Sequence, residues 1–109
     1  MKEYQFNENG VCINPDVLGG NDYQNSIRTY CKNGKWFADV CYTFTGQDWQ
    51  GGMHGVQGEY DSKRDAVVAA CKHLQEKMNY AKTHCRVDTT DCQACVDKAY
   101  AEVTQLSLF

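Results

Sequence analysis

Residues 26–44 read SIRTYCKNGKWFADVCYTF, and the Asn33-Gly34 step in the middle of this stretch predicts a β-hairpin. Asn-Gly favours a two-residue type I′ turn, because both central residues of that turn need a positive φ. Pairing Lys32 with Lys35 then sets the register of the two strands. Because side chains alternate along a strand, one face of the hairpin carries Ile27, Thr29, Cys31, Trp36, Ala38, Val40, Tyr42 and Phe44. This largely apolar face is expected to be buried.

The opposite face of the same hairpin has compatible cross-strand pairs. Tyr30 lies opposite Phe37, and Arg28 lies opposite Asp39. Aromatic pairs and pairs of opposite charge stabilise neighbouring strands by a few tenths to about 1 kcal/mol. Both faces therefore support the same register.

Weaker signals predict the rest of the sheet. Asn9-Gly10 favours a turn between residues 4–6 and residues 11–13, with Pro15 ending the second segment. Residues 15–22 and 46–52 are rich in turn formers and are predicted to be loops. A third strand of the main sheet is expected at residues 53–60.

Two helices are predicted after the strands. Ser62-Lys63-Arg64-Asp65 is a variant of the capping box, and apolar residues at three- and four-residue spacing follow it to about Thr83. Residues 90–93 (TDCQ) form a second capping box, whose helix is expected to end near Thr104. The predicted fold class is α+β, an antiparallel sheet of three or more strands packed against two C-terminal helices, in a single domain of residues 1–104.

Composition limits the function classes. The chain has 109 residues and a formal net charge of -3, which lacks the basic excess typical of nucleic-acid-binding proteins. The N-terminal residues have no apolar stretch typical of an export signal, and no window approaches the roughly 18 apolar residues of a membrane span. We therefore expect a cytoplasmic protein with reduced cysteines.

The densest group of potential metal ligands is His84, Cys85, Cys92 and Cys95. Four nitrogen or sulfur donors suit tetrahedral zinc, but adjacent residues such as His84 and Cys85 rarely chelate one ion together. Cys92 and Cys95 also lie on the apolar stripe of the last predicted helix, where free cysteine behaves as a small buried hydrophobe. We predict structural thiols and no cofactor, with zinc and a redox pair as the alternatives.

No nucleophile with its base, pair of carboxylates or phosphate-binding loop marks the chain as an enzyme. His54, between glycines, is the most suggestive single residue, and His73 is expected to be solvated. Residues 34–40 (GKWFADV) and 60–70 (YDSKRDAVVAA) resemble AP2-type and integrase-arm DNA-binding domains across about residues 26–80. This resemblance implies that the outward sheet face meets DNA. Only Arg28 is basic on that face, and Asp39 opposes it.

The sequence ends in Gln105, Leu106, Ser107, Leu108 and Phe109. This QLSLF ending resembles, at every position, the pentapeptide by which bacterial DNA polymerases, mismatch-repair proteins and clamp-loading factors bind the DNA sliding clamp. The resemblance implies that Gln105 forms hydrogen bonds at the clamp cleft, Leu106 packs beside it, and Leu108 with Phe109 fills the main pocket. The alternative is that the last helix continues and the tail packs on the core of its own domain.

We therefore predict a small binding or adaptor protein, not an enzyme, that docks on the bacterial DNA polymerase sliding clamp. It would act in replication or repair, or as a phage or mobile-element modulator. One alternative is a sheet-based nucleic-acid-binding module. Another is an inhibitor or adaptor of a host protein, whose tail is purely structural. In these alternatives the nucleic acid or partner protein would bind a face formed by Arg28, Tyr30, Phe37 and Trp49.

Overall fold

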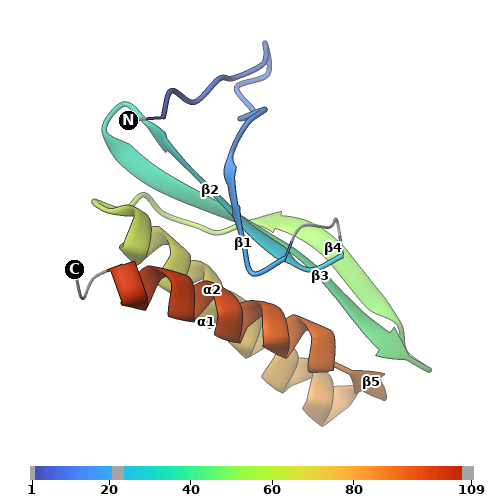
Figure 1. The fold of residues 1–109 in the computed structure, drawn as a ribbon. Helices are drawn as coiled ribbons and strands as arrows, with labels where there is room; N and C mark the ends of the chain where they lie inside the picture. Colours follow the sequence, from blue (N-terminus) through green and yellow to red (C-terminus); the bar gives the residue numbers. More distant parts are fainter. Residues whose placement is uncertain (1, 21–23, 107–109) are drawn as a thin grey trace.

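The predicted α+β class is confirmed by a computed structural model, which describes residues 2–20 and 24–106 (Figure 1). The strands are β1 (Asp16–Leu18), β2 (Ser26–Lys32), β3 (Lys35–Gly46), β4 (Gln50–Gly55) and β5 (Val87–Asp88). The helices are α1 (Lys63–His84) and α2 (Thr90–Leu106). Neighbouring strands are antiparallel in the order β1-β2-β3-β4, and β5 pairs with the end of β3. Figure 1 shows both helices on one side of the sheet, so the fold has two layers.

The central hairpin has the predicted register. Lys32 pairs with Lys35, and the pairing continues without interruption to Ser26 opposite Cys41. Asn33 has φ 54° and Gly34 has φ 79°, as a type I′ turn requires. The Tyr30 and Phe37 rings stack with their centroids 5.5 Å apart.

The core lies between the predicted apolar face and the two helices. Ile27, Val40 and Phe44 from the sheet are fully buried, together with Leu74 and Met78 from α1. Each such side chain gains roughly 1.5–3 kcal/mol on full burial. Thr29, a polar residue on this face, is also fully buried, and its hydroxyl donates a hydrogen bond to the Phe37 carbonyl at 2.8 Å.

The strands outside the central hairpin differ from the prediction. Residues 16–18, expected in a loop, form β1, because Leu18 pairs with Ile27 and is buried. The third strand of the main sheet is β4, which starts at Gln50 and ends at Gly55, earlier than the predicted residues 53–60. Tyr60 forms only an isolated bridge with Trp36, and the first predicted hairpin is reduced to a bridge between Phe6 and Cys12.

Both helices form, with one of the two predicted caps. The Ser62 hydroxyl accepts a hydrogen bond from the Asp65 amide at 3.0 Å, which confirms the first capping box. The second box is wrong. Thr90 is already helical, and its amide is satisfied by the Asp88 carboxylate at 2.8 Å, so the cap lies before the predicted residues. Within the described residues, neither helix is long and apolar enough to cross a membrane.

Candidate partner-binding site

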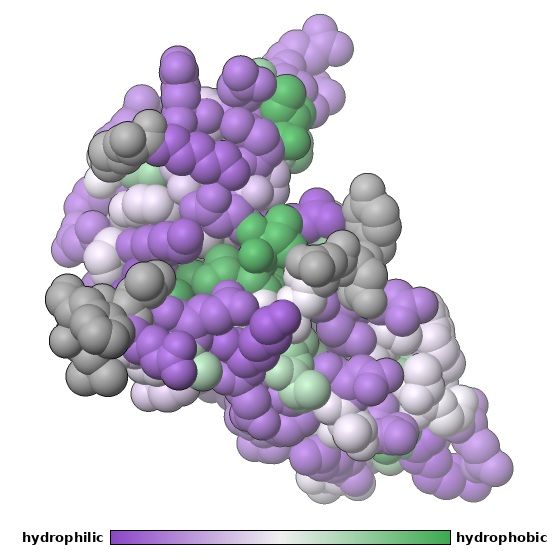
Figure 2. All heavy atoms as spheres, viewed as in Figure 1, coloured by the Kyte–Doolittle hydropathy of each residue, from purple (hydrophilic) through white to green (hydrophobic). Residues whose placement is uncertain are grey.

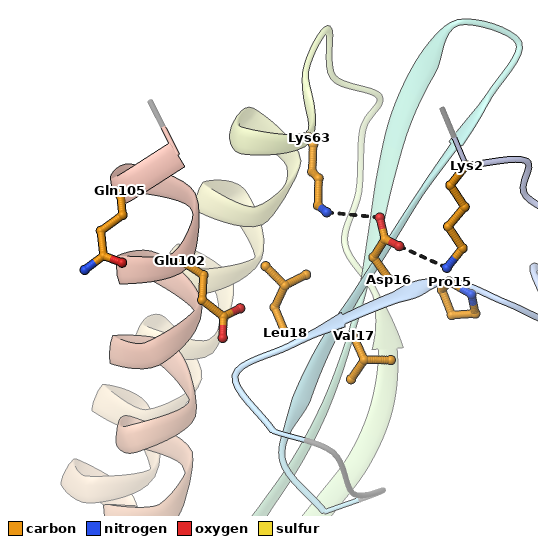
Figure 3. A pocket seen from close by; sticks show the side chains of 8 residues that line it. All are labelled: Lys2, Pro15, Asp16, Val17, Leu18, Lys63, Glu102 and Gln105. Carbon is orange, nitrogen blue, oxygen red and sulfur yellow. Dashed lines mark hydrogen bonds and ion pairs between the residues drawn. The ribbon is translucent and has the colours of Figure 1, made fainter. Parts of the chain in front are cut away.

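The C-terminal end of α2 lies beside β1 and the start of α1, and these elements surround an open cavity of about 650 Å³ (Figure 3). Glu102 and Gln105 line it from α2, and Lys63 lines it from α1. Asp16 and Leu18 contribute from β1. Figure 2 shows apolar atoms at the surface in the region of β1, where the strand meets α2. The cavity therefore adjoins the first residue of the predicted clamp-binding peptide.

Asp16 connects the segments that form one wall of the cavity. Its carboxylate accepts hydrogen bonds from Lys2 Nζ and Lys63 Nζ, each at 3.0 Å, and from the Tyr4 hydroxyl at 2.5 Å. Burial raises the pKa of Asp16, but these three donors outweigh it and lower the pKa to about 2. Both lysines lining the cavity thus pair with one carboxylate, which joins the N-terminal segment, β1 and α1. The three side chains therefore connect three separate segments of the chain at the cavity wall.

The peptide itself begins inside α2. Gln105 and Leu106 belong to the last turn of the helix, which continues beyond its predicted end at Thr104. Gln105 is exposed, and Val103, two residues earlier, is buried in the core. The side chain of Leu106, and Leu108 and Phe109 entirely, lie outside the described residues.

The last turn of α2 differs in charge from the last turn of α1. Its last turn has no basic residue to interact with the carbonyl end of the helix dipole. The last turn of α1 contains Lys82 and His84, and the Cys85 amide donates to the Ala81 carbonyl at 2.8 Å. The Thr104 hydroxyl donates to the Tyr100 carbonyl at 2.8 Å, one turn before the end of α2.

The four residues predicted for a second binding face do not form one surface. Arg28, Tyr30 and Phe37 lie on the sheet face away from the helices, but Phe6 packs on Tyr30 at 5.6 Å between ring centroids. Trp49 is 63% exposed in the turn between β3 and β4. Nine residue steps along β3, roughly 30 Å at 3.3 Å each, separate Phe37 from Gly46, the end of β3 that adjoins this turn.

The electrostatics of this face do not favour nucleic acid. Asp39 lies opposite Arg28 in the register; burial raises the pKa of Asp39, and the nearby guanidinium partly counteracts that rise. Lys35, at the turn, forms an ion pair with Asp61. The two cations near the aromatic pair of this face, Arg28 and Lys35, thus already have acidic neighbours.

The structure does not bring the predicted zinc ligands together. Cys92 is buried in the core, and Cys95 is buried against Gly19. The Cys85 sulfur accepts a hydrogen bond from Gln50 Nε2 at 2.9 Å, and the His84 ring packs on Tyr80. Among residues 2–20 and 24–106, no group of three or more histidine, cysteine or acidic side chains could hold a metal ion.

Burial favours the protonated form of two of the thiols. Burial raises the pKa of Cys92 to about 12 and that of Cys71 to about 11, so both remain protonated. All seven cysteines are free thiols.

One cluster was missed by the sequence analysis. The Tyr42 hydroxyl lies 3.3 Å from His54 Nε2, and their rings stack. His73, expected to be solvated, is half-buried beside Tyr42 at a cavity of about 340 Å³, and its Nε2 is buried without a hydrogen-bond partner in the described structure. The sequence analysis did not find this cluster because it started the third strand at Met53. That start omitted the pair of Tyr42 with Gly52, which positions His54.

Comparisons with protein-family models, curated proteins and solved structures found no significant match to this chain.

Proposed function

We propose that this chain is a small binding protein that docks on the bacterial DNA sliding clamp through residues 105–109. The single observation that carries the proposal is the sequence QLSLF, which agrees with the clamp-binding pattern at all five positions. In this proposal the protein acts in the cytoplasm, in replication or repair or as a phage or mobile-element modulator of the clamp. The α+β body holds the peptide at the end of α2.

An extended peptide requires Gln105 and Leu106 to leave the last helical turn. That turn lacks a basic residue, and helix ends open at a free-energy cost close to zero when few contacts hold them. Gln105 is exposed, so its release removes no buried side chain from the core. The helical state of Gln105 is therefore compatible with binding in an extended form.

The free energy gained by burying the proposed anchors is close to the cost of ordering the peptide. Ordering the backbone costs roughly 1–2 kcal/mol per residue. Full burial of two leucines and a phenylalanine contributes roughly 1.5–3 kcal/mol for each side chain. The small difference between these terms predicts a modest and reversible affinity, which suits a protein that shares a clamp with others.

The test is binding to a purified bacterial sliding clamp, measured by surface plasmon resonance. The intact chain is compared with a Leu108→Ala and Phe109→Ala double variant, which should bind at least tenfold more weakly. Tyr100→Ala is the matched control, because Tyr100 is 50% exposed on α2 but lies outside the peptide. It should bind like the intact chain.

Two outcomes would contradict the proposal. The first is equal binding by the intact chain and the double variant, or no binding by either. The second is a loss of binding together with a melting temperature lowered by several degrees, since a tail that is free to bind contributes little to stability. In that case the tail would belong to the protein's own core.

The alternative functions have weaker support. A nucleic-acid-binding module needs several phosphate contacts, whereas the chain has a net charge of -3 and places Arg28 opposite Asp39. A host-protein inhibitor using Tyr30, Phe37 and Trp49 would need one surface. The paired Tyr30 and Phe37 lie near the start of β3, whereas Trp49 lies beyond its other end. A gel shift at low salt tests the first alternative.

A further inference from the structure

The two edge strands of the main sheet differ in how they are protected. Edge strands expose unpaired backbone groups, and proteins usually blunt them with short length, charge or proline. β1 has three residues, follows Pro15 and contains Asp16. β4 has six residues, reads QGGMHG, and contains neither a charged residue nor proline. Of these two edge strands in the described part of the chain, β4 is therefore the one open to pairing with another strand.

The register identifies which groups of β4 point outward. The Val56 amide donates to the Ala38 carbonyl at 2.9 Å, one residue beyond the pair of Gly55 with Asp39. Hydrogen-bonded pairs alternate along an antiparallel ladder, so Gly52 and His54 direct their amides and carbonyls to β3. The remaining residues of the strand, Gly51, Met53 and Gly55, direct theirs to the open edge. In the described part of the chain no strand pairs with this edge.

We propose that β4 pairs antiparallel with β4 of a second copy of this chain, around a two-fold axis at Met53. In this register Met53 lies opposite Met53 of the partner copy, and Gly51 lies opposite Gly55 of the partner copy. All three outward residues then form hydrogen-bonded pairs. A two-fold axis perpendicular to the sheet keeps both helix layers on the same face of the combined sheet.

The composition of β4 favours pairing with β4 of a second copy over pairing with a charged strand. It carries no charge, so two-fold pairing places no like charges opposite each other. Met53 is 57% exposed at the axis, where it would contact the same side chain of the partner copy. The Trp49 ring lies over Gly51, so an aromatic surface flanks the Met53 contact on each side of the axis. The glycines leave no side chain to obstruct the approach.

The interface is small. One strand pair with a methionine and a tryptophan from each copy is below the roughly 1,200 Å² typical of stable complexes. The dimer is therefore expected to be weak, with a dissociation constant on the order of micromolar. Sedimentation over a wide range of concentrations should show a shift from 12.4 kDa toward twice that mass.

The test uses charges at the axis. Met53→Lys and Met53→Glu should each be monomeric at concentrations where the intact chain is dimeric, because like charges then face each other. An equimolar mixture should restore the dimer, because lysine then faces glutamate. Val11→Lys is the control: Val11 is 56% exposed, similar to Met53, but lies in the N-terminal segment. It should dimerise like the intact chain.

Hydrogen exchange supplies a second readout. The amides of Gly51, Met53 and Gly55 should exchange at least tenfold more slowly at dimer-forming concentrations, while those of Gly52 and His54, already directed to β3, change little. Circular dichroism establishes that the Met53 variants are folded. An intact chain that stays monomeric to millimolar concentration overturns the proposal. So do variants that still dimerise alone, and a mixture of the two that stays monomeric.

Discussion

Gly19 lies directly against Cys95, so that the end of β1 touches the middle of α2. A Cβ atom at position 19 would lie 2.5 Å from the Cys95 carbonyl oxygen and 2.6 Å from its Sγ. Gly19 also has φ 79°, a conformation that L-residues with a side chain rarely adopt. Glycine is therefore required at this position for two independent reasons, and the contact fixes how closely β1 approaches α2.

The first prediction is that Gly19→Ala destabilises the protein by roughly 2–4 kcal/mol, because it combines a positive φ with a steric clash against helix backbone. Gly34→Ala is the control, since Gly34 also has φ 79° but has no atom within 4 Å of an added Cβ. The control should lose only about 1 kcal/mol. Urea unfolding measures both, and equal losses would show that the contact with Cys95 does not matter.

The second prediction concerns Asp16. Its folded-state pKa of about 2 is below the usual value, so its stabilising effect is fully present above about pH 4 and is lost as the pH falls through 2. Asp16→Asn should lower the free energy of unfolding by about 1–2 kcal/mol at pH 7. Urea unfolding at pH 7, 4, 3 and 2 should show this difference shrinking as the pH falls.

Asp61→Asn is the control for Asp16. Asp61 also pairs with a lysine, Lys35, but its side chain is largely exposed, and solvent screens such pairs. Its substitution should change stability less than that of Asp16. A difference at Asp16 that stays constant from pH 7 to pH 2 would contradict the proposed role of its carboxylate.

The central hairpin and both helices could be predicted because their signals are local. Asn33-Gly34 alone sets the turn and the register, and Ser62 marks the start of α1. β1 could not be predicted, because its three residues are too few to show alternation, and it is stabilised by distant contacts such as Leu18 with Ile27. β4 was misplaced because glycines, which usually mark loops, lie within the strand.

The candidate sites also divide into features that follow from local sequence and features that depend on tertiary contacts. The peptide starting at Gln105 is a sequence pattern and needs no tertiary information. The separation of the predicted zinc ligands depends on side-chain direction, since Cys92 is buried in the core while the Cys85 sulfur contacts Gln50. The position of His73 at a cavity depends on Tyr42 of β3 and Gln50 of β4, which line the cavity with it and which the helix pattern alone does not reveal.

The third prediction is that the cysteines react with iodoacetamide in two groups. The thiolate is the reactive form, and burial raises the pKa of Cys92 from 9.0 to about 12, which lowers its thiolate fraction about 1,000-fold. The slow group should be Cys41, Cys71, Cys92 and Cys95, and the faster group Cys12, Cys31 and Cys85. Mass spectrometry of the folded protein measures the rates, with the urea-unfolded chain as control. Labelling of Cys92 as fast as that of Cys85 in the folded protein would contradict its burial.

The fourth prediction is that His73 makes stability depend on pH between 7 and 5. Burial lowers the pKa of His73, and the nearby Lys77 and His54 lower it further, against the smaller opposing effect of Glu76. The fold therefore favours the neutral ring, and stability is present above pH 6.5 and is lost as the pH falls through the lowered pKa.

The comparison that tests this role uses His73→Leu, which stays neutral at every pH. Between pH 7 and 5 the intact chain should lose more unfolding free energy than this variant. His84→Leu is the control, because His84 is exposed at the end of α1 and has no part in the cluster of Tyr42, His54 and His73. It should retain the pH dependence of the intact chain. If His73→Leu loses as much stability as the intact chain, the pH dependence arises elsewhere, and the buried Nε2 atom is tolerated in both protonation states.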